Sequence, residues 1–196
     1  MQDIDKNARE QMRAAVLRLA QINETELDKI ISLFTLKNIP KKTIVIHENE
    51  SSDKLNFVIK GLVRIFYRKD DREVTNWFIE ENNFFAATSS LFTGQKNVYI
   101  YEALEDTTVL EASYSQLEKL FEKSHDLEHL GRKLIEYYYA LFLKKSHDMM
   151  FLSAEERYQG LLQQHPEWMN RIPLKYIASY LGLTQETLSR LRAVRI

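Results

Sequence analysis

Residues 174–193 read LKYIASYLGLTQETLSRLRA, and their spacing predicts how the C-terminal part of the chain folds. Two helices that cross through a short turn need a small residue where their backbones approach, and Ala178 occupies that place. Gly182 follows where the chain must turn with a positive φ, and Thr184 is placed to cap the second helix. The stretch therefore predicts a helix-turn-helix locked by apolar side chains: Ile177, Leu181, Leu183, Leu188 and Leu191.

The second of these helices carries polar side chains on the face that we expect to be exposed. In a DNA major groove, Glu186 would accept a hydrogen bond from cytosine, and Arg190 would make a bidentate contact with guanine. Thr184, Thr187 and the helix N-terminus are suited to phosphates. The alternative is an ordinary helical hairpin, in which alanine, glycine and leucine are also common. The sequence favours double-stranded DNA as the partner, contacted by Thr184, Gln185, Glu186, Thr187, Ser189, Arg190 and Arg192.

The charge distribution agrees with a polyanion partner at the C-terminal end. The 196 residues have a net charge of -1, but residues 170–196 contain five basic residues and one acidic residue, a balance of 5 − 1 = +4. The remainder therefore carries -5, so we expect little affinity for nucleic acid elsewhere. The absence of cysteine excludes disulfides, thiolate metal sites and a cysteine nucleophile. No membrane span and no secretion signal are recognisable, so a cytoplasmic location is expected.

The residues before position 113 predict two short helices followed by a β domain. Helical spacing of apolar residues continues through the first 34 residues, and short runs rich in Val, Ile, Phe and Tyr follow. Turn-prone clusters separate these runs, which is typical of a small antiparallel barrel or jelly roll. The predicted strands are Thr43–Ile46, Asn56–Ile59, Leu62–Tyr67, Val74–Ile79, Val98–Tyr101 and Thr108–Leu110.

Helical periodicity returns after Ser113, so the predicted fold class is α+β. Ser113–Gln116 reads as a capping box, and Ser153–Glu156 as a second one that begins a helix through Gln164. Between them a long helix, about 126–151, has apolar residues on two stripes. One stripe can pack on the chain itself, and the other predicts a two-fold dimer through the same helix of a second copy. The alternative is a helix buried within one chain.

The residues that carry a family resemblance come from two separate parts of the chain. Glu186-Thr-Leu-Ser189-Arg190 resembles the E-x-x-S-R reading element of the Fnr branch of the Crp/Fnr superfamily of bacterial transcription regulators, which reads a TTGAT-like half-site. Phe57–Arg64 resembles the strand-turn-strand of that family's cyclic-nucleotide-binding-type sensor, a double-stranded β-helix. The resemblance implies a homodimer that reads an inverted repeat. It also implies a sensor domain over 1–125, a dimerisation helix over 126–152 and a DNA-binding domain over 153–196.

Two departures from that family bear on the function. Residues 83–98 match the segment in which cyclic AMP binders carry an acidic residue and an arginine, but they contain neither, so we expect no binding of cyclic AMP. Thr88, Ser89, Ser90, Lys96 and Asn97 are candidates for another polar effector, and a solvated loop is the alternative. Family members usually continue into a β-hairpin wing, whereas this sequence ends at Ile196, so a complete wing is not expected.

An enzymatic function is not predicted. His125, Glu128 and His129 fit the H-x-x-E-H pattern of some zinc proteases, but surface or capping histidines explain the match better. His47 is the single histidine before position 125, so a metal-binding β domain is not expected. The sequence thus predicts a transcription regulator without cofactor, metal site or catalytic residues. The alternative is a ligand-binding or interaction module whose wing-less DNA-binding end has decayed.

Overall fold

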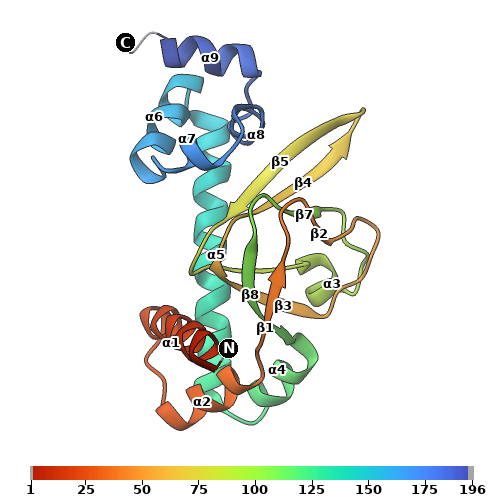
Figure 1. Cartoon of the computed structure of the whole chain (residues 1–196), viewed down its shortest axis with the longest axis vertical. Helices are drawn as coiled ribbons and strands as arrows, with labels where there is room; N and C mark the ends of the chain where they lie inside the picture. Colours follow the sequence, from red (N-terminus) through yellow and green to blue (C-terminus); the bar gives the residue numbers. More distant parts are fainter. Residues whose placement is uncertain (1, 194–196) are drawn as a thin grey trace. The chain divides into compact units, whose positions relative to one another are not determined.

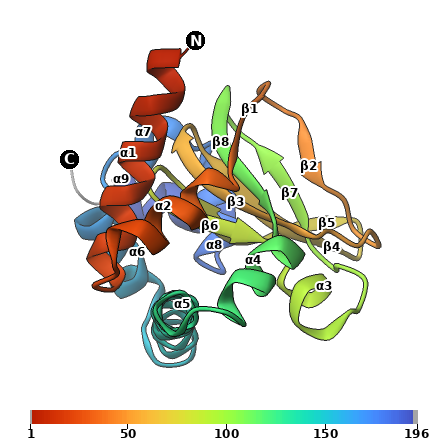
Figure 2. The same cartoon turned by 90° about the horizontal axis from the view of Figure 1, so that it is seen from below.

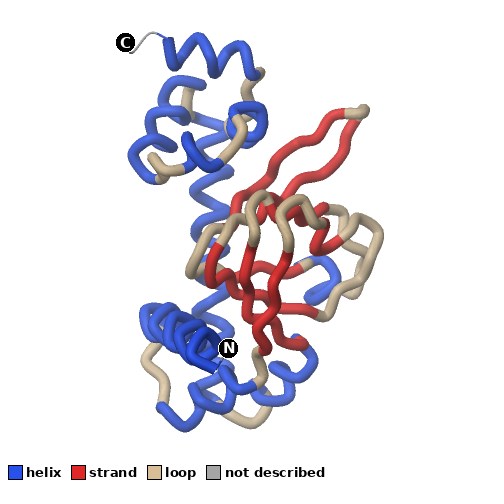
Figure 3. The backbone as a smooth tube through the Cα atoms, in the orientation of Figure 1, coloured by secondary structure: helices blue, strands red, loops and turns tan. Residues whose placement is uncertain are grey.

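The structure is a computed structural model that describes residues 2–193; along the sequence, helices come first and last, and the strands come between them (Figures 1 and 3). Two helices come first, α1 (Gln2–Leu19) and α2 (Glu24–Ser32), as the sequence predicts. Arg9 of α1 donates hydrogen bonds to the carbonyl oxygens of Ile31 at 2.8 Å and Phe34 at 2.9 Å, so it satisfies the C-terminal end of α2. Helix α1 packs on α2 and on strand β3 (Lys54–Lys60), and helix α4 (Tyr114–Phe121) packs on strand β8 (Thr107–Ser113) (Figure 2).

The strands form two four-stranded sheets, which confirms the predicted α+β class and the β domain. The first sheet has the order β1 (Thr35–Ile39), β8 (Thr107–Ser113), β3 (Lys54–Lys60), β6 (Phe84–Ala86). The second has the order β2 (Ile44–Ile46), β7 (Ile100–Ala103), β4 (Val63–Lys69), β5 (Arg72–Ile79). The core is apolar, and its fully buried side chains include Phe57, Val58, Leu62, Val63, Val109 and Leu110.

The turn between β3 and β4 requires a glycine. Gly61 has φ +108, a conformation that side chains with a Cβ rarely adopt. A Cβ there would lie 2.4 Å from Oγ1 and 2.7 Å from the Cα of Thr107, so the backbone of β8 comes too close for any side chain. The turn between β4 and β5 passes through Asp70 at φ 49 and Asp71 at φ 59, which suits a tight hairpin.

Several sequence-based boundaries differ from the structure. Strands β1 and β6 were not predicted. Strand β7 begins at Ile100, two residues after the predicted start, and the Val98 side chain is exposed. The predicted capping box at Ser113 is wrong, because the Ser113 side chain makes no cap hydrogen bond within its helix. Its hydroxyl donates to the Asp53 carboxylate at 2.5 Å, and Asp53 also accepts from the Ser115 amide at 3.0 Å. A distant carboxylate therefore stabilises the start of this helix.

The C-terminal helices agree more closely with the sequence. Helix α5 extends over His125–Phe151, within a residue of the predicted limits. Helix α6 begins with the predicted capping box, in which Ser153 and Glu156 exchange hydrogen bonds at 3.2 Å and 2.8 Å. Two helices precede α5, namely α3 (Thr88–Thr93) and α4 (Tyr114–Phe121). Four helices follow it: α6 (Ala154–Gln164), α7 (Trp168–Arg171), α8 (Leu174–Tyr180) and α9 (Gln185–Ala193).

Backbone packing groups the chain into two compact units. One contains the chain up to Ile65 together with Phe78–Tyr137, and the other contains Phe66–Trp77 together with the chain from Tyr138 onward. The outer part of the β4–β5 hairpin is therefore in the same unit as α6–α9. The division at residues 125 and 152 that the sequence suggests stays a prediction.

Candidate nucleic-acid interface

Helices α8 and α9 form a tightly packed pair joined by a short turn. Ile177, Ala178 and Leu181 are buried on the α8 side, and Leu188 is buried on the α9 side. Gly182 has φ +68, as the sequence predicts for the turn, and the Leu183 amide donates to the Ala178 carbonyl at 2.8 Å. The pair is held from within by apolar packing, which leaves the outer side of α9 available.

Thr184 caps the N-terminus of α9. Its Oγ1 accepts a hydrogen bond from the Thr187 amide at 3.1 Å and lies 2.9 Å from the Thr187 hydroxyl. Glu186 lies in the first turn, where a negative charge interacts favourably with the helix dipole. The start of α9 is thus fixed by local hydrogen bonds.

All seven predicted DNA contacts lie on the exposed side of this pair: Thr184, Gln185, Glu186, Thr187, Ser189, Arg190 and Arg192. The side chains of Glu186 and Arg190 are 75% and 78% exposed, and they form an ion pair one turn apart. An exposed pair of this kind contributes little to stability, so its partners are free to exchange for others. Arg195, the last basic residue of the sequence, lies outside the described residues.

Two contacts that the sequence analysis missed hold the turn before α9. Arg157 of α6 donates from Nε to the Leu181 carbonyl at 3.0 Å and from Nη1 to the Leu152 carbonyl at 2.6 Å. It therefore links the ends of α5 and α8. Met149 of α5 packs against Gly182, where an added Cβ would lie 2.7 Å from the Met149 methyl carbon. The Arg after the Ser153–Glu156 capping box was the one local signal, but Leu181, one of its two partners, is 24 residues away in the sequence.

The five candidate ligand residues do not share one environment. Thr88, Ser89 and Ser90 lie on α3, Lys96 is exposed on the following loop, and Asn97 is 1% exposed. The Asn97 side chain donates to the carbonyls of His47, at 3.1 Å, and Tyr99, and it accepts from the Tyr99 amide. The Asn97 side chain therefore stabilises the loop in which it lies, and its role in binding an effector stays a prediction.

Two buried polar side chains of the β domain were also missed. Arg64 is 0% exposed, with Nη1 at 3.7 Å from the Glu102 carboxylate. Asn56 is 1% exposed, and its amide oxygen and nitrogen have no hydrogen-bond partner among residues 2–193. Asn56 lies between Leu55 and Phe57, and Arg64 lies between Val63 and Ile65, so a polar residue with apolar neighbours on both sides was the available signal.

Helix α5 presents a large apolar face. Ile135, Tyr139, Phe142, Leu143 and Met150 follow at intervals that place them on one side of the helix, and all are exposed.

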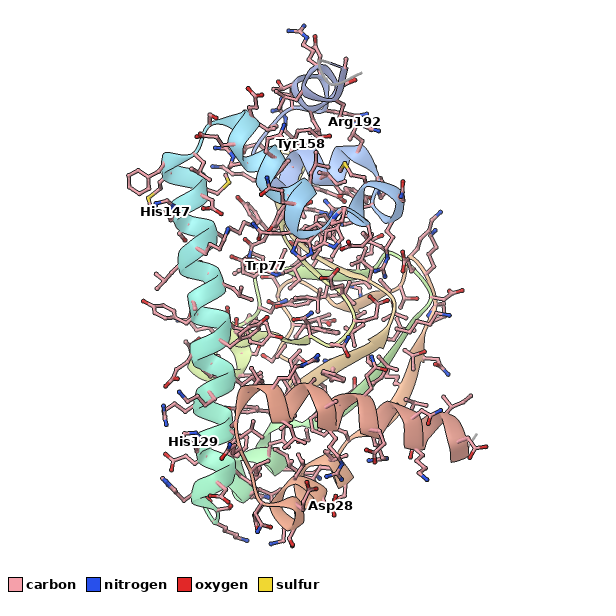
Figure 4. All side chains as sticks on the ribbon, turned by 90° about the vertical axis from the view of Figure 1, so that its left-hand side faces the viewer. Asp28, Trp77, His129, His147, Tyr158 and Arg192 are labelled. Carbon is pink, nitrogen blue, oxygen red and sulfur yellow. The ribbon has the colours of Figure 1, made fainter. Side chains whose placement is uncertain are left out.

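The H-x-x-E-H residues lie at the start of the same helix. His125 and Glu128 are exposed there, with the His125 ring nitrogen 3.9 Å from the Glu128 carboxylate, and the His129 ring nitrogen lies 2.8 Å from the Arg132 guanidinium. Figure 4 shows His129 and His147 on α5. No helix among residues 2–193 has the length and apolar character of a membrane span.

Comparison with known proteins gives one family match, one similar curated protein and two similar solved structures. Residues 36–124 match the family of cyclic nucleotide-binding domains. The cAMP-activated global transcriptional regulator CRP of Pasteurella multocida is 25% identical over 177 residues, which is 84% of each chain. The solved structure of the c-di-GMP-responsive global regulator CLP of Xanthomonas campestris has a TM-score of 0.68 and 20% identity, covering 88% of this chain and 91% of that one. FixK2 of Bradyrhizobium japonicum also has a TM-score of 0.68, with 23% identity over 82% and 83%.

Proposed function

Because this chain is a transcription regulator of the Crp/Fnr type, we propose that it binds double-stranded DNA as a homodimer, with α9 of each copy in a major groove. The observation that carries the proposal is the exposed polar face of α9, a helix whose N-terminus is capped and whose apolar side is buried against α8. The chain acts by binding and carries no catalytic activity. Its cytoplasmic location stays a prediction.

The chemistry of the α9 face fits base reading. Arg190 donates two parallel hydrogen bonds to guanine, and Glu186 accepts one from cytosine. In the free protein these two side chains form an ion pair with each other, and each would exchange this partner for a base when DNA binds. Thr184 and Thr187 lie at the helix N-terminus, where phosphate is favoured. The half-site is then TTGAT-like, as the sequence resemblance implies.

The exposed face of α5 supports the dimer. Its apolar residues extend from Ile135 to Met150, about 23 Å along the helix axis at the usual rise per residue. A face of this length on a single helix matches the seam of a two-helix packing, in which a second copy presents the same residues across a two-fold axis. The two α9 helices would then read the halves of an inverted repeat.

The effector is a polar molecule other than cyclic AMP, or none. Residues 83–98 contain no acid and no arginine, so the segment lacks a bidentate partner for a ring phosphate. Asn97, at the place of the arginine, is engaged with its own loop. A thermal-shift titration with cyclic AMP should therefore leave the melting temperature unchanged, since only a bound ligand raises it.

The test of DNA binding is an anisotropy titration of the full chain with an inverted TTGAT-like duplex and with a scrambled one, at about 50 and about 200 mM salt. We expect a preference of roughly a hundredfold or more at both salt concentrations. Arg190→Ala should reduce the preference about tenfold or more, because one bidentate base contact is lost.

Arg132→Ala is the matched control. Arg132 forms the same kind of exposed ion pair, with Glu136 one turn away on α5, but it is not on the proposed interface. It should leave both affinities unchanged. Equal, weak binding of wild type to the two duplexes, lost at the higher salt, would instead favour a module whose DNA-binding end has decayed.

A further inference from the structure

The outer part of the β4–β5 hairpin packs on the helices that carry α9. Residues Phe66–Trp77 are in the same compact unit as the C-terminal helices, although β4 and β5 continue without a break into residues of the other unit. Within the unit, the hairpin contacts α5 through Lys145 and α8 through Ser179 and Tyr180. Nothing in the proposed DNA contact itself requires this packing.

Ser179 joins α8 to the edge of β5. Its hydroxyl accepts a hydrogen bond from the Thr75 amide at 2.9 Å and donates one to the Glu73 carbonyl at 3.2 Å. A single side chain thus satisfies a donor and an acceptor of a strand that lies last in its sheet. The two hydrogen bonds fix both the position and the orientation of the Ser179 side chain, because a hydroxyl that bonds to two backbone groups has little freedom to move.

Lys145 of α5 contacts both the hairpin and α8. Its ammonium group donates to the Asn76 carbonyl and lies 5.0 Å from the centre of the Trp77 ring and 4.1 Å from that of Tyr180 (Figure 4 labels Trp77). The two rings meet edge to face, with centres 6.4 Å apart. A cation held by two aromatic faces is attracted to both, and the attraction is stronger when water is excluded. Burial opposes the charge and lowers the pKa of Lys145 to about 7, so Lys145 is mostly a cation only below pH 7, where the exchange experiment is run.

The same aromatic cluster continues toward α7. Trp168, which is 2% exposed, packs edge to face on Tyr180 with ring centres 5.7 Å apart, and it stacks on His165 at 4.1 Å. Tyr180 therefore contacts the hairpin, α5 and α7 from the last position of α8. The residue after Leu181 is Gly182, the turn that leads into α9.

We propose that the hairpin sets the orientation of the α8–α9 pair, with Lys145 and Ser179 as positioning residues. Strands β4 and β5 then connect the cyclic nucleotide-binding fold to α8, the helix that precedes α9, alongside the connection through α5. A displacement of β5 moves the Thr75 amide and the Asn76 carbonyl, and with them the end of α8. The expected change in DNA affinity rests on the proposed function, whereas the expected change in the hydrogen exchange of α9 does not.

Hydrogen–deuterium exchange on the full chain tests the proposal without DNA. Lys145→Met keeps most of the apolar side chain and removes the cation, and Ser179→Ala removes only the hydroxyl. We expect either change to speed exchange about tenfold in Arg72–Trp77 and also in Gln185–Ala193, which neither residue contacts. Lys144→Met, which breaks an exposed ion pair with Asp148 next to Lys145, is the matched control and should leave both segments unchanged.

Two further variants distinguish positioning from simple packing. Lys145→Arg retains a cation that stacks on aromatic rings, and Ser179→Thr retains the hydroxyl, so both should restore slow exchange in α9. The same proteins are then titrated with the inverted-repeat duplex, for which Lys145→Met should weaken binding several-fold. Faster exchange confined to the hairpin, with α9 unaffected, would overturn the proposal. Altered exchange in α9 in a chain whose wild type binds no duplex would support the positioning role and contradict the proposed function.

Discussion

Replacement of Gly182 by alanine separates the strain of the turn from its effect on DNA binding. Gly182 has φ +68, and a left-handed conformation costs alanine about 1–2 kcal/mol. Alanine also restricts the unfolded chain, which returns about 0.4–1 kcal/mol, so the net loss of unfolding free energy is about 1 kcal/mol. The new Cβ would lie 2.7 Å from the methyl carbon of Met149, and moving that flexible end adds about 0.5–1 kcal/mol.

Gly94 supplies the matched control, because its φ is +66 and a Cβ there would meet no atom of the described part of the chain within 4 Å. Urea unfolding should show Gly94→Ala losing about 1 kcal/mol and Gly182→Ala about 1.5–2 kcal/mol. Only Gly182→Ala should reduce affinity for the inverted-repeat duplex, by about tenfold, since the turn fixes the start of α9. The reasoning fails if the two variants lose equal stability and bind the duplex equally well.

Three further predictions concern the dimer, the buried lysine and the buried amide. Phe142→Glu should convert the dimer to a monomer in sedimentation velocity, whereas Ile4→Glu, at an exposed apolar residue of α1, should not; a monomeric wild type would contradict this. Burial lowers the pKa of Lys145 to about 7 from 10.5, so the unfolded chain binds more protons between those values. The unfolding free energy should therefore rise from pH 7 to pH 9 by up to about 1.4 kcal/mol per pH unit, and Lys145→Met should lose this slope in urea titrations. Tyr180, whose pKa burial raises to about 12, does not titrate in that range; equal slopes would refute the assignment. Asn56→Leu should raise the unfolding free energy by about 1–3 kcal/mol, because an unpartnered amide is removed, and a loss of stability would show that the amide has a partner.

The parts of the fold that the sequence predicts are those that local interactions determine. The capping box at Ser153 is satisfied within four residues, and the periodicity of α5 does not depend on its partners. The box at Ser113 has the same kind of pattern but a better acceptor, Asp53, which lies 60 residues away. Strand β1 alternates polar and apolar residues weakly, because it lies last in its sheet and its side chains are mostly exposed.

The candidate interface shows the same division. The exposure of Glu186 and Arg190 follows from helical spacing, so the spacing of apolar residues alone is enough to predict that face. The contacts that position α9 are not readable in the same way. Arg157 binds a carbonyl 24 residues away, and Lys145 binds one 69 residues away, so only the folded chain brings them together.

The most direct measurement for the central claim is hydrogen–deuterium exchange of the full chain with and without the inverted-repeat duplex. If the exposed side of α9 lies in the major groove, the duplex should protect Gln185–Ala193 and the Thr184 turn, and scrambled DNA should not. Protection that spares α9, or that is the same with both duplexes, would contradict the account.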